Sequence, residues 1–144
     1  AISALERSCG SYGSPPIDWD SPTPWQADMQ SAMHCGFHRP EDLARVQKNP
    51  NLWCAAEHYR AAGEQYLATR SGDVQSGAKM LWAALEISQR QGALAWEIRS
   101  RISLARHYGA DGDRRKTAAM LQPILDRFAK DSVNADVRLA WKML

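Results

Sequence analysis

Apolar side chains recur every three to four residues through most of the second two-thirds of the chain, which is the spacing of one face of an α-helix. The pattern occurs twice, over residues 51–92 and 93–130, each time as an apolar helix, a Gly-Asp turn and a second apolar helix. The turns are Ser71-Gly72-Asp73 and Asp111-Gly112-Asp113, so the two Gly-Asp pairs lie 40 residues apart. We therefore predict an all-α chain with two antiparallel helix hairpins.

Capping and helix-breaking residues predict where these helices begin and end. Asp73 and Asp113 suit the N-caps of the second helices, and Gly92 stands where a helix C-terminus favours a left-handed residue. Pro123 falls inside the last pattern, where it should kink the helix or loosen its first half. Residues 133–144 form a final amphipathic stretch, which we expect to cap the open end of the helix stack.

The N-terminal third has a different character and divides the chain into residues 1–48 and 49–144. Residues 9–24 contain two glycines and four prolines, which exclude a continuous helix and predict a Pro-rich crossover. Two helices should follow, from residue 23 to about 35 and from residue 40 to about 48. The first eight residues, which begin without Met, look like the tail of a helix and suggest a fragment of a longer protein.

The small residues of the two hairpins resemble those of a tetratricopeptide repeat. The resemblance implies a right-handed solenoid of stacked hairpins, although the period of 40 residues exceeds the usual length of about 34. Matching positions of the second helices are Gly72, Gly77, Leu81 and Ala84 in the first copy, and Gly112, Thr117, Leu121 and Ile124 in the second.

A further resemblance covers residues 53 to about 130, through the stretches Trp53–Glu64 and Gln91–Arg106. They are similar to the C-terminal tetratricopeptide region of large bacterial signalling proteins that carry winged-helix DNA-binding or nucleotide cyclase domains, often with an ATPase module. Residues 9–48 do not match it. The resemblance implies a non-catalytic, cytoplasmic module for protein–protein or intramolecular recognition, in signal transduction or transcription regulation.

The first helices of tetratricopeptide hairpins line the concave side of the stack, so their polar positions are the candidate partner-binding groove. Such side chains could bind a protein or peptide partner, or other domains of the parent protein. They could equally form local helix salt bridges worth about 0.3 kcal/mol each, and both interpretations remain open. The candidate positions are Glu57, Arg60, Glu64, Glu97, Ser100 and Arg101.

A second candidate site is the short cluster His34, Cys35 and His38. It suggests the alternative function, a small metal-dependent or Cys/His enzyme. However, a structural zinc site needs four ligands, and a cysteine nucleophile needs a base held by a third group. We therefore expect no cofactor, no metal and no catalysis, with these three residues as the weak candidates for a metal site.

Composition narrows the remaining function classes. The net charge of +2 is too small to indicate nucleic-acid binding, and Arg114-Arg115-Lys116 is typical of a solvated helix face. The three cysteines contain no CxxC pair, which favours reduced thiols in a cytosolic setting. No apolar run approaches the roughly 18 residues of a membrane span. Two hairpins leave apolar rims exposed, so we expect residues 1–48 to cover them, with a homodimer or further upstream repeats as the alternatives.

Overall fold

The computed structural model describes residues 23–69, 73–129 and 131–144. Within these ranges the chain is all-α and contains no strand, as the sequence predicts. The predicted helix tail at residues 1–8, most of the Pro-rich crossover and the turn residue Gly72 lie outside the described residues. The elements are α2 (Pro24–Met33), a 3-10 turn η2 (Cys35–Phe37), α3 (Pro40–Lys48), α4 (Ala55–Ala68), α5 (Val74–Arg90), α6 (Leu94–Tyr108), α7 (Arg114–Leu125) and α8 (Ala135–Met143).

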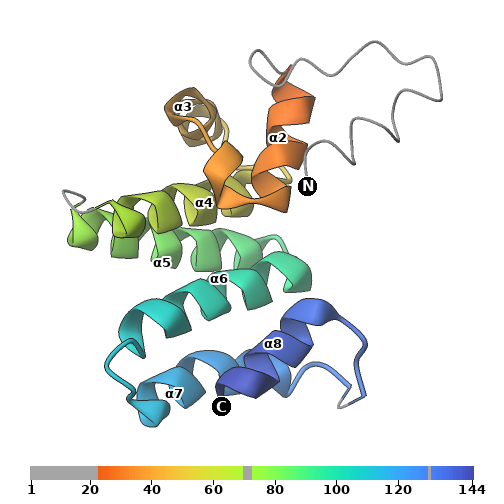
Figure 1. Ribbon diagram of the computed structural model, residues 1–144. Coiled ribbons are helices and arrows are strands. Elements are labelled where there is room, and N and C mark those ends of the chain that lie inside the picture. The colour runs from red at the N-terminus through yellow and green to blue at the C-terminus, as the bar shows by residue number, and fades with distance from the viewer. Residues whose placement is uncertain (1–22, 70–72, 130) are drawn as a thin grey trace, which may run out of the picture.

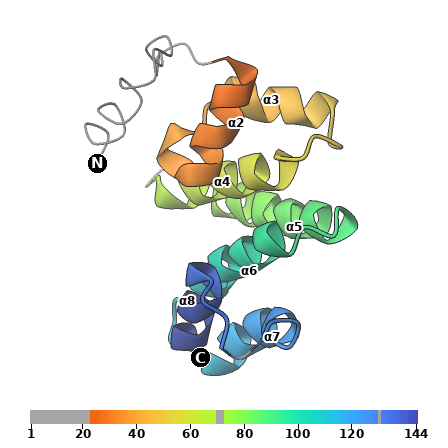
Figure 2. The same cartoon turned by 90° about the vertical axis from the view of Figure 1, so that its right-hand side faces the viewer.

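Helices α4 to α7 follow one another in space as they do along the chain, each packed against the next (Figure 1). Helices α2 and α3 pack on α4 at one end of this row, and α8 packs on α6 and α7 at the other end. In the turned view α2 and α8 lie on the same side of the row (Figure 2). None of the described helices is long and apolar enough to cross a membrane.

The apolar core runs through the row as three clusters of buried side chains. One lies between α3, α4 and α5 around Val46 and Ile87, the next between α5 and α6 around Leu81 and Leu104, and the last between α6, α7 and α8 around Ile98. Each fully buried aliphatic side chain contributes about 1.5–3 kcal/mol. The periodic apolar positions of the sequence are therefore what holds neighbouring helices together.

Caps fix the helix ends at the predicted places. Thr23 forms a capping box with Gln26 at the start of α2. Asp73 accepts hydrogen bonds from two backbone N–H groups at the start of α5, and Asp113 does the same for α7. Gly92 has a φ of 66° after α5, a conformation that side chains with a Cβ rarely adopt.

Two helices are shorter than the pattern predicts. Helix α4 begins at Ala55 rather than at residue 51, because the chain after Pro50 forms turns whose backbone hydrogen bonds span three residues. Helix α7 ends at Leu125 rather than near residue 130. Pro123 lacks an N–H group, and the residues that follow it adopt tighter turns, in which Phe128 donates to the carbonyl of Leu125 at 3.1 Å.

Candidate functional site

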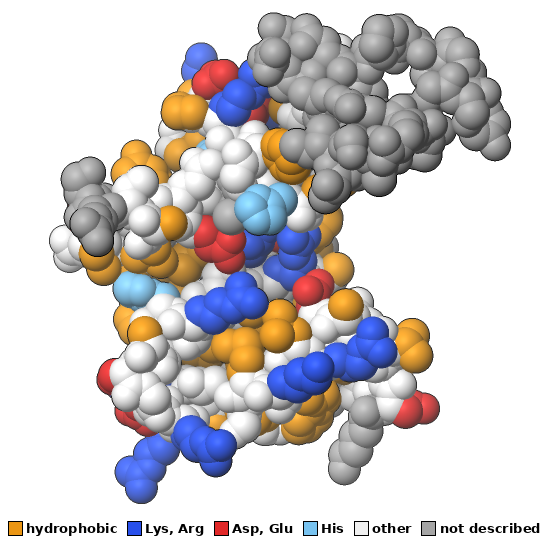
Figure 3. Space-filling view, viewed as in Figure 1, with side chains coloured by type: hydrophobic (Ala, Val, Ile, Leu, Met, Phe, Trp, Pro, Cys, Tyr) orange, Lys and Arg blue, Asp and Glu red, His pale blue; other side chains and the backbone are white. Residues whose placement is uncertain are grey.

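A groove crosses one face of the molecule along α4 and α6, between the end of α2 and helix α8 (Figure 3). It consists of two adjoining hollows of about 230 and 370 Å³, which share Glu64, Ser103 and Arg106 in their walls. Acidic and basic side chains gather in this hollowed face. We call it the α4–α6 groove; it is lined by Met33, His34, Arg60, Glu64, Leu67, Ala68, Arg99, Ile102, Ser103, Arg106, His107, Ala110, Asp136 and Leu139.

Glu57 of α4 is the centre of the ion pairs beneath this groove. The side chain is completely buried, and its carboxylate accepts two hydrogen bonds from the guanidinium group of Arg60, at 3.0 and 2.9 Å. Arg99 of α6 approaches the same carboxylate at 2.9 Å. Because a buried carboxylate needs charged and hydrogen-bonded partners, these contacts fasten α4 to α6.

Arg60 carries the network up to the groove wall. Its Nη1 lies 2.9 Å from the carboxylate of Glu64, which also accepts a hydrogen bond from the hydroxyl of Ser103 at 2.5 Å. Burial by itself would lower the pKa of Arg60, but the carboxylates of Glu57 and Glu64 outweigh it and raise the pKa above its ordinary value. The guanidinium group is therefore charged, and its orientation is fixed at the base of the groove.

Arg99 connects the network to the N-terminal part of the chain. Its Nη1 donates to the backbone carbonyl of Ala32 at the end of α2, at 2.7 Å. The guanidinium carbon also lies 5.7 Å from the ring centroid of Trp96, a cation–π distance. One arginine side chain therefore holds α2, α4 and α6 in contact at one end of the groove.

Arg106 and Asp136 differ from the other charged residues of the groove. Arg106 on α6 is exposed, and Asp136 at the start of α8 is half-buried. Within the described part of the chain, neither side chain takes part in a hydrogen bond or an ion pair. Among the described residues, a cation on α6 and an anion on α8 therefore line the same hollow without a charged partner.

A second buried glutamate, Glu97, occupies the corresponding place in the next hairpin. It accepts hydrogen bonds from Arg101 at 3.0 Å, from Arg127 at 2.8 Å and from Gln89 at 3.2 Å. Arg101 also donates to the backbone carbonyl of Met120 in α7, at 2.9 Å. These bonds join α5, α6 and the segment after α7, so Glu97 and Arg101 act within the packed interior.

The structure distributes the six predicted groove residues between two roles. Arg60 and Glu64 line the groove, whereas Glu57, Glu97 and Ser100 are buried, and Arg101 bonds inward. The predicted local pairs, Glu57 with Arg60 and Glu97 with Arg101, both exist. The sequence reasoning missed Arg99, Ser103 and Arg106, whose spacing of three and four residues places them on one face of α6.

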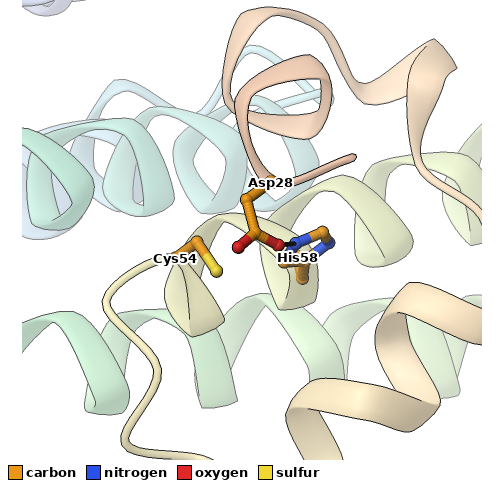
Figure 4. A group of neighbouring side chains, drawn as sticks. All are labelled: Asp28, Cys54 and His58. Atoms are coloured by element: carbon orange, nitrogen blue, oxygen red, sulfur yellow. Dashed lines mark hydrogen bonds and ion pairs between the residues drawn. The ribbon is translucent and has the colours of Figure 1, made fainter. Parts of the chain in front are cut away.

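A separate polar cluster joins α2 to the start of α4. Figure 4 shows Asp28 pointing from α2 toward Cys54 and His58. All three are buried, and one ligand atom of each lies within 4.8 Å of the others. His58 Nε2 lies 2.9 Å from Asp28 Oδ1, and the Nδ1 atoms of His58 and His38 are 3.3 Å apart. Arg45 of α3 also contacts the Asp28 carboxylate.

Burial and hydrogen bonding shift the pKa values in this cluster. Burial would raise the pKa of Asp28, but hydrogen bonds from His58 and Arg45 hold that pKa below its usual value. Burial, with a contribution from Asp28, raises the pKa of the Cys54 thiol to about 12. Burial and the neighbouring His58 lower the pKa of His38 to about 4. At neutral pH without a metal, Cys54 is therefore a protonated thiol, which is a poor nucleophile.

The two histidines of the predicted Cys/His cluster, His34 and His38, lie in different surroundings. His34 is exposed at the end of α2, and its Nδ1 accepts a hydrogen bond from the backbone of Gly36 at 2.9 Å. His38 is buried against His58. The side chain of Cys35 lies outside the described part of the chain. Of the two histidines, His38 but not His34 therefore touches a buried polar cluster, and the partners there, Asp28 and His58, come from elsewhere in the sequence.

The basic run at the start of α7 lies at the surface. Arg114, Arg115 and Lys116 are exposed. Lys116 Nζ lies 2.7 Å from the carboxylate of Asp111 and 3.7 Å from that of Asp113, and the hydrogen bond with Asp111 raises the pKa of this lysine. The two aspartates offset part of the positive charge of the run, which agrees with a solvated helix face.

Comparison with known proteins gives no relative: no family model, no curated protein and no solved structure matches this chain. Functional inference therefore depends on the groove, the polar cluster and the sequence pattern.

Proposed function

We propose that this chain is a non-catalytic interaction module of tetratricopeptide type, whose α4–α6 groove binds an extended segment of a protein. The observation that carries the proposal is the groove itself. It runs along the first helices of two successive hairpins, which is where the sequence resemblance places a binding surface. Its walls combine fixed charges, a buried hydroxyl and apolar side chains, a mixture that suits a peptide better than an apolar ligand.

Corresponding contacts in the two hairpins support a repeated, solenoid-like architecture. Glu57 and Glu97 lie 40 residues apart, and each is buried and paired with an arginine of its own helix and with one from a later part of the chain. Asp73 and Asp113 repeat the same N-cap at the same spacing. The repetition extends from sequence to interactions, as expected of a duplicated structural unit.

The charges of the groove suggest how a peptide would bind. Arg106 is exposed, and none of the described carboxylates pairs with it, so it is available for a carboxylate of the ligand, with which arginine forms two parallel hydrogen bonds. Asp136, on the α8 wall, would pair with a basic group. Between them, Ile102 and Leu139 provide apolar contact. We therefore expect an extended segment that carries an acidic residue near its centre.

The biological setting follows from the resemblance at residues 53–130. We propose that the partner is another protein, or another domain of the same parent protein, in a cytoplasmic bacterial signalling or transcription-regulating system. The ion pairs of Glu57 and Glu97 would keep the groove rigid, so that a partner meets a preformed surface and loses little binding energy to ordering.

A pair of charge-reversal variants tests the proposal. Peptide arrays that tile the proteins encoded next to this chain's gene, probed with the purified chain, should give binders that Arg106→Glu weakens at least tenfold. The control is Arg115→Glu, which changes the charge equally on exposed α7 outside the groove and should leave the affinity unchanged. Equal affinity of both variants for every binder, or no binder at low salt, would reject the groove as the binding surface.

A further inference from the structure

We propose that Asp28, Cys54 and His58 form a zinc-binding site that fastens α2 to α4. The donor set is the first reason. A thiolate, an imidazole nitrogen and a carboxylate oxygen are the three ligand types that Zn²⁺ takes in proteins. Their ligand atoms lie within 4.8 Å of one another in a buried position on the side of α4 that faces α2 (Figure 4).

The local structure already holds the ligand atoms of Asp28, Cys54 and His58 close to the positions that a bound metal ion requires. Cys54 stands at the N-cap position of α4 and His58 lies four residues later, so both side chains project from one face of the first helical turns. Helix α2 supplies Asp28 from above. Bond lengths of 2.0–2.3 Å around tetrahedral zinc separate neighbouring ligand atoms by about 3.5 Å. The 2.9 Å between His58 Nε2 and Asp28 Oδ1 therefore requires only a small outward shift of side chains.

The surroundings provide the outer contacts that metal sites use. A histidine that binds zinc through Nε2 directs Nδ1–H to an acceptor, which fixes the ring. Here the Nδ1 of His38 lies 3.3 Å from the Nδ1 of His58 and can fill that role. When zinc binds, the Cys54 thiol proton passes to solvent, and the charges of the thiolate and the Asp28 carboxylate balance the two positive charges of the ion.

Arg45 is the one group that has to move. Its guanidinium group contacts Asp28 and lies 3.5 Å from His58 Nε2, where it occupies part of the coordination space. Its side chain is 29% exposed and comes from α3, and the carboxylate of Asp42 lies 4.0 Å from the same nitrogen. Arg45 can therefore turn to Asp42 and solvent, which leaves the fourth coordination position to a water molecule.

The test uses the full chain, purified with a chelator and a thiol reductant and then dialysed against ZnCl₂ or CoCl₂. We expect a single zinc ion per chain, a higher Tm with zinc than without, and a thiolate-to-cobalt charge-transfer band in the near ultraviolet. The Co²⁺ band needs no variant, so it reports thiolate ligation even if substitutions disturb folding, and the variants then assign the thiolate to Cys54. Cys54→Ser and Asp28→Asn should each weaken zinc binding at least tenfold.

Two control variants keep the test specific. Cys35→Ser removes another thiol, and Asp126→Asn removes an exposed carboxylate at the end of α7, far from the cluster, and neither should change zinc binding or the cobalt band. The proposal is overturned if the wild-type chain binds no zinc and its Tm does not respond to zinc. It is also overturned if Cys54→Ser keeps the metal, or if Cys35→Ser loses it. None of these outcomes depends on the α4–α6 groove.

Discussion

Helices α4 and α5 pack through glycines at the middle of their contact, whereas α6 and α7 have larger residues at the same places. A Cβ added at Gly63 would lie 3.0 Å from the backbone oxygen of Gly77, so these two helix backbones nearly touch. Forty residues further on stand Ser103 and Thr117. Helix α5 has 17 residues and α7 only 12, so the first hairpin is the longer and closer unit.

The difference between Gly63 and Ser103 follows from the part of the structure that each residue faces. Gly63 faces α5, where only a hydrogen leaves room. Ser103 instead donates its hydroxyl to Glu64 in the wall of the α4–α6 groove. The same repeat position therefore serves helix packing in one hairpin and groove polarity in the next. The 40-residue period therefore reflects the helix hairpin that both copies share. The positions at which the two hairpins carry different residues show where their contacts differ.

The largest expected difference between the hairpins concerns their buried glutamates. Arg60 and Arg99, the partners of Glu57, have side chains 6% and 21% exposed, whereas the partners of Glu97 are the largely buried Arg101, 12% exposed, and the accessible Arg127, 51% exposed. Glu57→Gln removes a negative charge from beside Arg60 and Arg99, two side chains that have little access to water. We therefore expect the free energy of unfolding to fall by about 3 kcal/mol. Glu97→Gln should cost about 1 kcal/mol, because Arg127 can rehydrate.

Urea unfolding followed by circular dichroism measures both variants. Glu57→Asp is the control, because it keeps the charge and shortens the side chain. The free energy of unfolding of Glu57→Asp should lie between that of wild type and that of Glu57→Gln. Equal losses for Glu57→Gln and Glu97→Gln would mean that the two ion-pair centres are energetically equivalent, contrary to their different exposure.

The second comparison concerns Gly63 and Ser103. Gly63→Ala forces the α4 and α5 backbones apart, and overpacking of this kind costs about 2 kcal/mol. Ser103→Ala loses the hydrogen bond to Glu64, worth about 1 kcal/mol. Thermal unfolding of the two variants tests the order. Helix propensity alone would make Gly63→Ala stabilising, so a rise in Tm would refute the close backbone contact.

Gly77→Ala is the matched control for this contact. At both glycines an added Cβ would first meet a leucine side chain at 2.8 Å, Leu81 at Gly63 and Leu67 at Gly77, but the facing backbone oxygen lies at 3.0 Å from the one and 3.2 Å from the other. We expect a smaller loss of stability than for Gly63→Ala. A larger loss would place the tightest backbone contact on the α5 side of the interface instead.

A smaller effect is expected at Pro123, which weakens the second hairpin. Pro123→Ala restores an N–H group that can donate to the carbonyl of Ala119 and allows α7 to continue past Leu125. We expect a gain of about 1 kcal/mol and slower amide hydrogen exchange over residues 123–128. The amides of α5 should exchange as in wild type. If exchange over residues 123–128 stays unchanged, Pro123 does not set the end of α7.

Much of the fold was predictable because it is local. Capping by Asp73 and Asp113, the stop at Gly92 and the periodic apolar stripes depend on neighbours within a few residues, and the structure confirms all of them. The predicted start of α4 at residue 51 was wrong, because a proline such as Pro50 is as compatible with a turn as with the first turn of a helix. The predicted end of α7 was also wrong, because the chain after Leu125 continues in tighter turns that the apolar spacing does not distinguish from a longer α-helix.

The sites were less predictable because they join distant segments. The sequence left two roles open for Glu57, a groove position and a local pair with Arg60, because the i, i+3 partner is visible in the sequence while Arg99 is not recognisable as a partner. The buried cluster could not be found from spacing alone. Cys54 and His58 form an i, i+4 pair, but Asp28 comes from a helix about 30 residues away whose packing no local pattern specifies.

The smallest expected difference between the hairpins concerns their caps. Asp73 and Asp113 each accept hydrogen bonds from two backbone N–H groups with near-identical backbone angles, and Asp73 also accepts one from the hydroxyl of Ser76, so Asp73→Ala should lower Tm slightly more than Asp113→Ala. Hydrogen bonds from Ser76 hold the pKa of Asp73 below its ordinary 3.8. Its ionised carboxylate therefore stabilises the fold above that pH, and the stabilisation disappears as the pH falls through the lowered pKa. The Tm values of wild type and Asp73→Ala should therefore converge as the pH is lowered. If the difference between the two Tm values instead stays constant down to pH values below the lowered pKa, the charge of Asp73 contributes nothing to the cap.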